Sequence, residues 1–72
     1  MADKDLIRFG RRVRATRERM GLSQEQLADN AGIHRTYVGG VERGERNLGL
    51  KNIVRLAKAL GVHVGDLFSE DS

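Results

Sequence analysis

The segment Gln24–Gly44, QEQLADNAGIHRTYVGGVERG, constrains the fold of this chain more than any other stretch. Ser23 precedes it and can cap a helix, because its side chain can accept a hydrogen bond from the free N–H groups of a first turn. Gln26, three residues later, has the spacing of a capping box. A short helix is therefore predicted over Gln24–Asn30. Gly32 ends this helix as a residue that adopts positive φ without strain.

A second short helix is predicted to begin near Arg35 and to end at Gly44. Val38 and Val41 are spaced i, i+3, so they are expected on the buried side of this helix. Ile33 is apolar within the turn and is expected to fill the gap between the two helices. Two short helices joined by such a turn cross at about 90–120°. The segment therefore predicts a helix-turn-helix.

These residues resemble the DNA-binding helix-turn-helix of lambdoid phage repressors and of the XRE-like bacterial regulators. The resemblance covers nearly the whole chain and implies an all-α, five-helix, lambda-repressor-like domain. The segment 35–43, with residues 46–48, looks especially like controller proteins of restriction–modification systems. The residues that carry the wider resemblance are Gln24, Leu27, Ala28, Gly32, Ile33, Val38 and Val41, with the flanks GLSQ, VERG and LAKALGV.

Three further helices are predicted around this motif, over Asp5–Met20, over Leu50–Leu60 and, as a short last turn, over 62–68. The remaining terminal residues, 1–4 and 69–72, are expected to be frayed or loose. The apolar stripe of the first helix is expected to consist of Leu6, Phe9, Gly10, Val13 and Met20. The inner face of the fourth is expected to consist of Leu50, Ile53, Val54, Ala57 and Leu60.

Chain length and composition predict one small domain over residues 1–72. A chain of this length buries only about 60% of its unfolded surface, so its core is small. The sequence has no cysteine, which excludes disulfides and thiolate metal sites. No apolar run approaches the ~20 residues that cross a membrane, and the first ten residues lack the apolar region of a signal peptide. We therefore expect a cytoplasmic protein without a membrane partner.

Charge favours a nucleic-acid partner. The chain has 13 Lys and Arg against 10 Asp and Glu, a formal net charge of +3, and a pI near 10.0. Arginines crowd the first helix, and others lie in or beside the second helix of the motif. Basic residues near one helix are typical of nucleic-acid binders, although a solvated basic face explains the charge alone equally well.

Arg17 falls on the apolar stripe of the first helix. A charged group on a buried face needs a partner, and the resembled family pairs an Arg and a Glu at these positions. Glu42 is therefore expected to pair with Arg17 and to fix the second helix of the motif. The alternative is that Arg17 extends its charged end to solvent while its stem is buried.

The resemblance implies that the second helix of the motif enters the DNA major groove, where its first residues face base edges. Arg can pair with guanine through two hydrogen bonds. Two adjacent glycines inside a helix are costly, at ~1 kcal/mol each relative to Ala. By spacing they share a face with Arg35, and without side chains they would let the helix backbone approach the duplex. The predicted base contacts are Arg35, Thr36, Tyr37, Gly39 and Gly40; Tyr37 is alternatively a half-buried packing residue.

The predicted contacts to the DNA backbone position the protein without reading sequence. Gln24 is the backbone clamp that the resemblance implies, aided by the helix dipole. The full set is Ser23, Gln24, His34, Arg43, Arg46 and Asn47. The resemblance also implies a homodimer on a two-fold operator, formed weakly or only on DNA, because one motif reads few base pairs. The predicted dimer interface is Val62, Val64, Leu67 and Phe68.

Other functions receive less support from the sequence. It contains no nucleophile–base pair and no Gly-rich phosphate loop, so an enzyme is not expected. The two histidines, His34 and His63, are too isolated in sequence for a metal site, and we expect neither a cofactor nor a small-molecule ligand. Single-stranded RNA binding favours stacking aromatics, which are scarce here. An antitoxin-like or protein-interaction module with the same fold stays open as the alternative.

Overall fold

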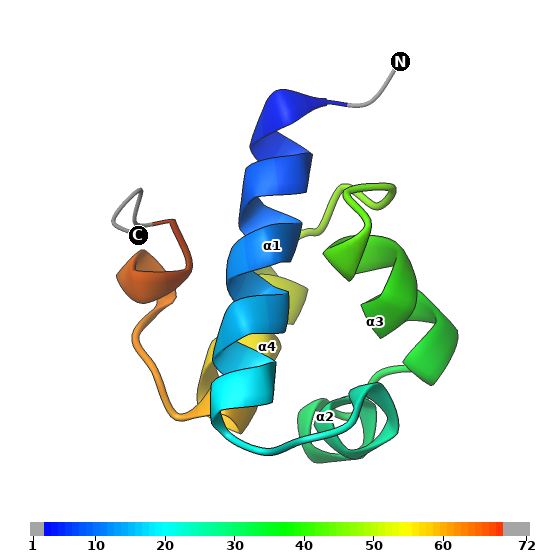
Figure 1. Ribbon diagram of the computed structural model, residues 1–72, viewed down its shortest axis with the longest axis vertical. Coiled ribbons are helices and arrows are strands. Elements are labelled where there is room, and N and C mark those ends of the chain that lie inside the picture. The colour runs from blue at the N-terminus through cyan, green and yellow to red at the C-terminus, as the bar shows by residue number, and fades with distance from the viewer. Residues whose placement is uncertain (1–2, 69–72) are drawn as a thin grey trace.

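The computed structural model describes residues 3–68, which form an all-α fold without a strand in that range. Four α-helices are followed by a 3-10 helix, η1, and the long α1 lies across the molecule with α3 on one side and η1 on the other (Figure 1). The all-α prediction is confirmed, and each predicted helix is present with bounds shifted by a few residues at most. The bounds are α1 Lys4–Arg19, α2 Gln24–Ala31, α3 Arg35–Glu42, α4 Leu50–Leu60 and η1 Val64–Phe68. Residues 1–2 and 69–72 of the predicted termini lie outside the described part.

The ends of α2 are set by local hydrogen bonds. Ser23 Oγ accepts from the Gln26 N–H at 3.0 Å, and Gln26 Oε1 accepts from the Ser23 N–H at 2.8 Å, which completes the predicted capping box. At the other end Gly32 has φ of 72°, and the Ile33 N–H donates to the Ala28 carbonyl at 3.0 Å. Because Gly32 supplies this left-handed turn, the chain reverses within a few residues and α3 can cross α2.

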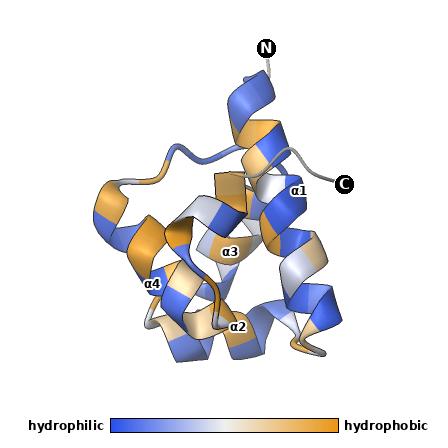
Figure 2. Cartoon of the chain, turned by 90° about the vertical axis from the view of Figure 1, so that its left-hand side faces the viewer, coloured by the Kyte–Doolittle hydropathy of each residue, from blue (hydrophilic) through white to orange (hydrophobic). Residues whose placement is uncertain are grey.

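The core lies among all five helices. Figure 2 shows hydrophobic residues of α3 and α4 toward the middle of the molecule. Ile33 is half-buried against this core, as expected for a residue that fills the turn of the motif. The largest fully buried side chains are Val13, Leu27, Val38, Val41, Leu56, Leu60 and Leu67. Every helix contributes to this set, so the position of α3 depends on the whole domain.

Gly10 allows α1 and α3 to touch at their backbones. A Cβ atom on Gly10 would collide with the carbonyl oxygen of Val41 and would lie 2.8 Å from that of Glu42. Any larger residue would therefore push the C-terminal end of α3 away from α1. This close approach places the last turn of α3 against the middle of α1.

Two predicted core positions are wrong. Leu50 is 72% exposed and Met20 is 51% exposed, because each lies at a helix end that extends past the core. Leu56 and Thr16, which were not among the predicted core residues, are buried. Within residues 3–68, no helix combines the length and apolarity needed to cross a membrane.

The predicted dimer interface needs one correction, at Leu67. This side chain is 1% exposed and belongs to the core, because η1 folds back against α1 and α4. Phe68 is 53% exposed, and its ring lies 5.1 Å from the ring of Phe9 between centroids. Leu67 therefore cannot contact a partner while η1 keeps this position.

Candidate nucleic-acid interface

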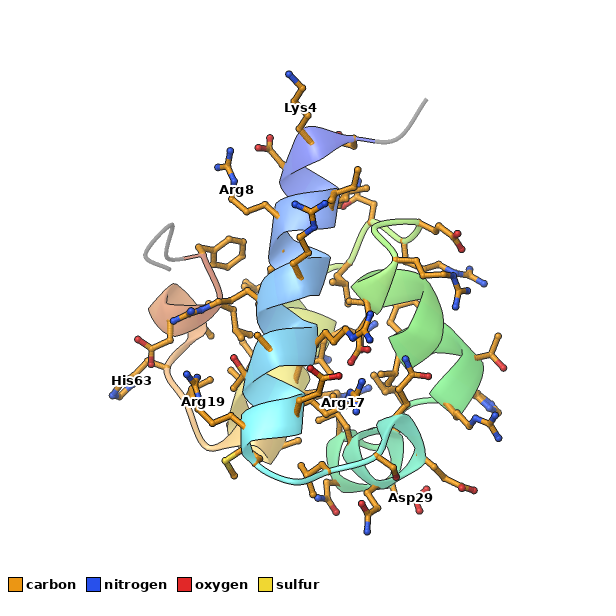
Figure 3. All side chains as sticks on the ribbon, in the orientation of Figure 1. Lys4, Arg8, Arg17, Arg19, Asp29 and His63 are labelled. Carbon is orange, nitrogen blue, oxygen red and sulfur yellow. The ribbon has the colours of Figure 1, made fainter. Side chains whose placement is uncertain are left out.

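Arg17 and Glu42 form the ion pair that was expected between α1 and α3. Arg17 Nε donates to Glu42 Oε2 at 2.6 Å and Arg17 Nη2 donates to Glu42 Oε1 at 3.0 Å, with the two side chains only 11% and 3% exposed. The third donor, Nη1, reaches the carbonyl of Leu22 at 2.8 Å. Figure 3 shows Arg17 on the side of α1 that faces α3, opposite Arg19.

This pairing keeps the arginine charged. The hydrogen bond to Glu42 raises the pKa of Arg17, while burial acts in the opposite direction. A folded-state pKa above the unfolded value adds stability that is fully present below the unfolded pKa. The pair therefore serves the fold throughout the neutral pH range.

Gln24 joins the same carboxylate from α2. Its Nε2 donates to Glu42 Oε1 at 2.9 Å. The sequence predicted Gln24 only as a DNA backbone contact and missed this bond, because nothing in its spacing identifies Glu42 as a partner. One carboxylate therefore connects α1, α2 and α3, so the inner side of α3 is held at its C-terminal end.

The first turn of α3 faces solvent. Arg35 and Thr36 are exposed, and so is His34, which occupies the N-cap position without a capping hydrogen bond from its side chain. An exposed Arg and Thr at the start of a helix can hydrogen-bond base edges in a major groove. The structure leaves these two predicted base-contact residues accessible.

Gly39 and Gly40 do not present open backbone, and that expectation from the sequence is wrong. Both are buried. A Cβ atom on Gly39 would lie 3.1 Å from Arg43 Nη1 and 3.5 Å from Gln24 Oε1. A Cβ atom on Gly40 would lie 2.8 Å from Arg46 Cγ. The Arg46 stem lies over Gly40, and the ends of the Arg43 and Gln24 side chains lie over Gly39, so these side chains cover the helix backbone in this arrangement.

Tyr37 is half-buried and packs against the core. Its hydroxyl accepts from Asn52 Nδ2 of α4 at 3.4 Å, and the Arg46 guanidinium carbon lies 5.8 Å from its ring centroid. Tyr37 therefore supports a neighbouring cation, in addition to the base contact that the sequence predicts for it.

The other predicted backbone-contact residues lie on exposed parts of the motif. Ser23, Arg43 and Asn47 are exposed, as is Arg46. Arg43 Nε lies 3.1 Å from Glu45 Oε1, and both side chains of this pair are 59% exposed. Water surrounds such a pair, so Arg43 can exchange its carboxylate for a phosphate at little cost. In residues 3–68, no group of three or more His, Cys, Asp or Glu has the arrangement of a metal site.

Comparison with known sequences assigns this arrangement to a class. The profile of the Helix-turn-helix family matches residues 13–67, which is most of the chain. The match includes α2, α3, Arg17 and Glu42. The chain belongs to this helix-turn-helix family, and its domain is of the XRE type.

Within this class the chain is similar to restriction–modification controller proteins. It is 44% identical to control protein C.BamHI from Bacillus amyloliquefaciens over 68 residues, covering 93% of this chain and 84% of that protein. The crystal structure of the controller protein C.AhdI from Aeromonas hydrophila superposes with a TM-score of 0.90 at 53% identity, covering 92% of this chain and all of that one. The controller protein C.Esp1396I, solved as a tetramer with its natural 35 base-pair operator, matches with a TM-score of 0.84 at 32% identity, covering 92% of this chain and 87% of that one.

Proposed function

We propose that this protein is a sequence-specific double-stranded DNA-binding transcriptional regulator that places α3 in the major groove. The observation that carries this proposal is the contrast between the two sides of α3. Its inner side is held by Glu42, while Arg35, Thr36, Arg43 and Arg46 lie exposed in α3 and the loop after it. The operator complex of C.Esp1396I supports the same use of this fold.

Each exposed group has a chemical task in this proposal. Arg35 and Thr36 contact bases from the first turn of α3. Arg43 and Arg46 contact phosphates near its other end, and each such contact releases counterions from the DNA. Ser23, His34 and Asn47 complete the contacts to the DNA backbone. Such a regulator acts in the cytoplasm and needs no catalytic group or cofactor.

Gln24 serves both sides of this arrangement. Its Nε2 is bonded to Glu42, while its Oε1 lies 3.5 Å from the position that a Cβ atom on Gly39 would take. We propose that Gln24 aligns the N-terminal turn of α2 on the DNA backbone, where the helix dipole favours a phosphate.

The regulator is proposed to act as a homodimer on a two-fold operator. Leu67 is not available for the dimer contact, but the exposed Phe68 of the predicted interface lines a mostly apolar groove together with Asp5, Leu6, Phe9, Asn47, Leu48 and Ile53. Leu50, one turn before Ile53 in α4, has a 72% exposed side chain, and we propose that it adds apolar surface to this contact. Val62 and Val64 are half-buried, so only the exposed part of each side chain is available for the dimer contact.

A salt-dependent binding titration tests the function. The purified protein is titrated against the DNA upstream of its own gene and against a scrambled duplex of equal length. A tight complex with two chains per site, and a clear margin over the scrambled duplex, is the expected result. Equal and steeply salt-dependent binding to both would reduce the interaction to phosphate attraction. A stoichiometric small protein that co-purifies would then favour the antitoxin-like alternative.

Sedimentation tests the dimer surface. Leu50→Ser is expected to shift the protein toward monomer without unfolding it, because this side chain is exposed in the single chain. Arg55→Ser, an exposed substitution elsewhere on α4, is the matched control. Unchanged association of Leu50→Ser would place the contact elsewhere.

A further inference from the structure

Arg46 folds back from the loop after α3 onto two residues of that helix. A Cβ atom on Gly40 would lie 2.8 Å from Arg46 Cγ and 3.1 Å from its Nε, so the arginine stem lies directly on the Gly40 backbone. The guanidinium carbon lies 5.8 Å from the centroid of the Tyr37 ring, within the range of a cation–π contact. Tyr37 and Gly40 are spaced i, i+3, so they are neighbours on the helix surface.

Space, and not backbone conformation, explains the glycine at position 40. The glycines with positive φ in the described chain are Gly21, Gly32, Gly44 and Gly61, whereas Gly40 lies in regular helix. Alanine could adopt this backbone and would be the better helix former. The atom that an alanine would strike belongs to the stem of Arg46 and not to its flexible end, so the whole side chain would have to move.

We call the surface that Tyr37 and Gly40 offer to Arg46 the seat. Its Tyr37 side packs on the core. The Tyr37 ring is half-buried against the hydrophobic cluster, and its hydroxyl is bonded to Asn52 of α4. Arg46 itself is exposed, so its guanidinium reaches solvent while it lies over the Tyr37 ring. A side chain that is ordered before binding loses less conformational freedom when it meets a ligand.

We propose that Gly40 and Tyr37 are positioning residues that hold Arg46 in its DNA-binding orientation. The proposal rests on the proposed DNA-binding function and assigns the glycine a role other than direct approach to DNA. Gly40 supplies the space for the arginine stem, and Tyr37 supplies the surface for its guanidinium. The adjacent Gly39 differs, because a Cβ there would lie 3.1 Å from the terminal Nη1 of Arg43 and 3.5 Å from Gln24 Oε1, which are the ends of side chains and not an arginine stem.

A double-mutant cycle tests the proposal, with Gly40→Ala, Arg46→Ala and the double variant measured for operator affinity and for unfolding in urea. Gly40→Ala is expected to weaken binding about fivefold or more in the wild-type background and less than about twofold in the Arg46→Ala background. Its stability is expected to stay the same or to rise, because alanine favours a helix. Gly65→Ala is the control, because a Cβ atom there meets nothing within 4 Å, and it is expected to bind as the wild type does.

Three outcomes would overturn the proposal. Gly40→Ala could bind like the wild type, could lose the same affinity without Arg46, or could unfold more easily, which would make Gly40 a residue of the fold alone.

A measurement without DNA separates this proposal from the proposed function. The ¹⁵N relaxation of Arg46 Nε in the free protein is expected to show a more ordered group than Arg11 Nε, an exposed arginine of α1. Gly40→Ala is expected to remove this difference. If the wild-type protein bound no operator, the DNA-binding function would fail while this result still reported on the seat. An equally mobile Arg46 and Arg11 would overturn the seat itself.

Discussion

Two arginine–carboxylate pairs lie at the C-terminal end of α3, and they differ in almost every physical respect. Arg17 and Glu42 meet through two hydrogen bonds, with 11% and 3% of their side chains exposed. Arg43 and Glu45 meet through Nε and Oε1 at 3.1 Å, with 59% of each exposed. The residues of the first pair are 25 positions apart in the sequence, whereas those of the second pair are near neighbours.

The difference shows how one short helix can serve both the fold and a ligand. A buried charge that loses its partner stays in a poor environment, so Glu42 is tied to its place. An exposed charge exchanges its partner for water or phosphate with little change in free energy. The fixed inner side of α3 therefore carries an outer side whose cations are available for binding. Four predictions test this contrast.

Replacement of the buried carboxylate gives the largest expected effect. Glu42→Ala leaves the Arg17 guanidinium and the Gln24 amide without their partner, and it is expected to cost ~3–5 kcal/mol of unfolding free energy. Urea denaturation followed by circular dichroism measures this loss. Glu45→Ala is the control. A loss below about 1 kcal/mol for Glu42→Ala would mean that the buried pair stabilises the fold no more than an exposed pair does.

The close approach of α1 and α3 gives the next effect. Gly10→Ala is expected to lower the unfolding free energy by about 1–3 kcal/mol, because the added methyl group meets backbone that cannot move aside. This result opposes helix propensity, which favours alanine. Ala15→Gly, the reverse exchange on the exposed side of α1, is expected to cost about 1 kcal/mol through propensity alone. A more stable Gly10→Ala variant would show that the helices can separate freely.

On the outer side of α3, the expected effect concerns DNA and not stability. Arg35→Ala is expected to reduce the preference for operator over scrambled DNA by about 1–3 kcal/mol, because base contacts discriminate between sequences. Salt-dependent titrations on both duplexes measure it, with Arg55→Ala of α4 as the control. Equal losses on the two duplexes would remove Arg35 from the base-contacting residues.

The smallest effect is expected for the exposed pair. Glu45→Ala frees Arg43 from a neighbouring negative charge, and it should strengthen DNA binding by less than about 1 kcal/mol at low salt. The gain should decline as salt is raised, since screening weakens exposed charges. Unfolding in urea should not change measurably. Weaker DNA binding by this variant would mean that the pair orients Arg43 for contact.

Local signals explain why much of the fold was predictable. The capping box of Ser23 and the glycine turn at Gly32 involve residues close in sequence, and their hydrogen bonds are those the spacing predicts. The partner of Arg17 was predictable for a different reason. A cation on an apolar stripe requires a carboxylate, and the family resemblance indicated Glu42.

Residues at helix ends were less predictable, since periodicity indicates a face but not how far the core extends. Leu50 and Ile53 share a face of α4, yet Leu50 lies beyond the core and Leu56 lies within it. Leu67 and Phe68 are adjacent and apolar, and only the path of η1 decides that Leu67 is the buried one. Those distinctions depend on contacts between elements far apart in the chain.

By itself, the sequence determined the order and bounds of the helices, the turn of the motif and the class of protein, because these depend on short-range hydrogen bonds and on recognisable spacing. The tertiary structure alone decided what Gly10 and Gly40 do. Gly10 makes room for a backbone that arrives from α3, and Gly40 for an arginine that folds back from a loop. A glycine carries no sign of the group that fills its space, so its role becomes visible only when that neighbour is in place.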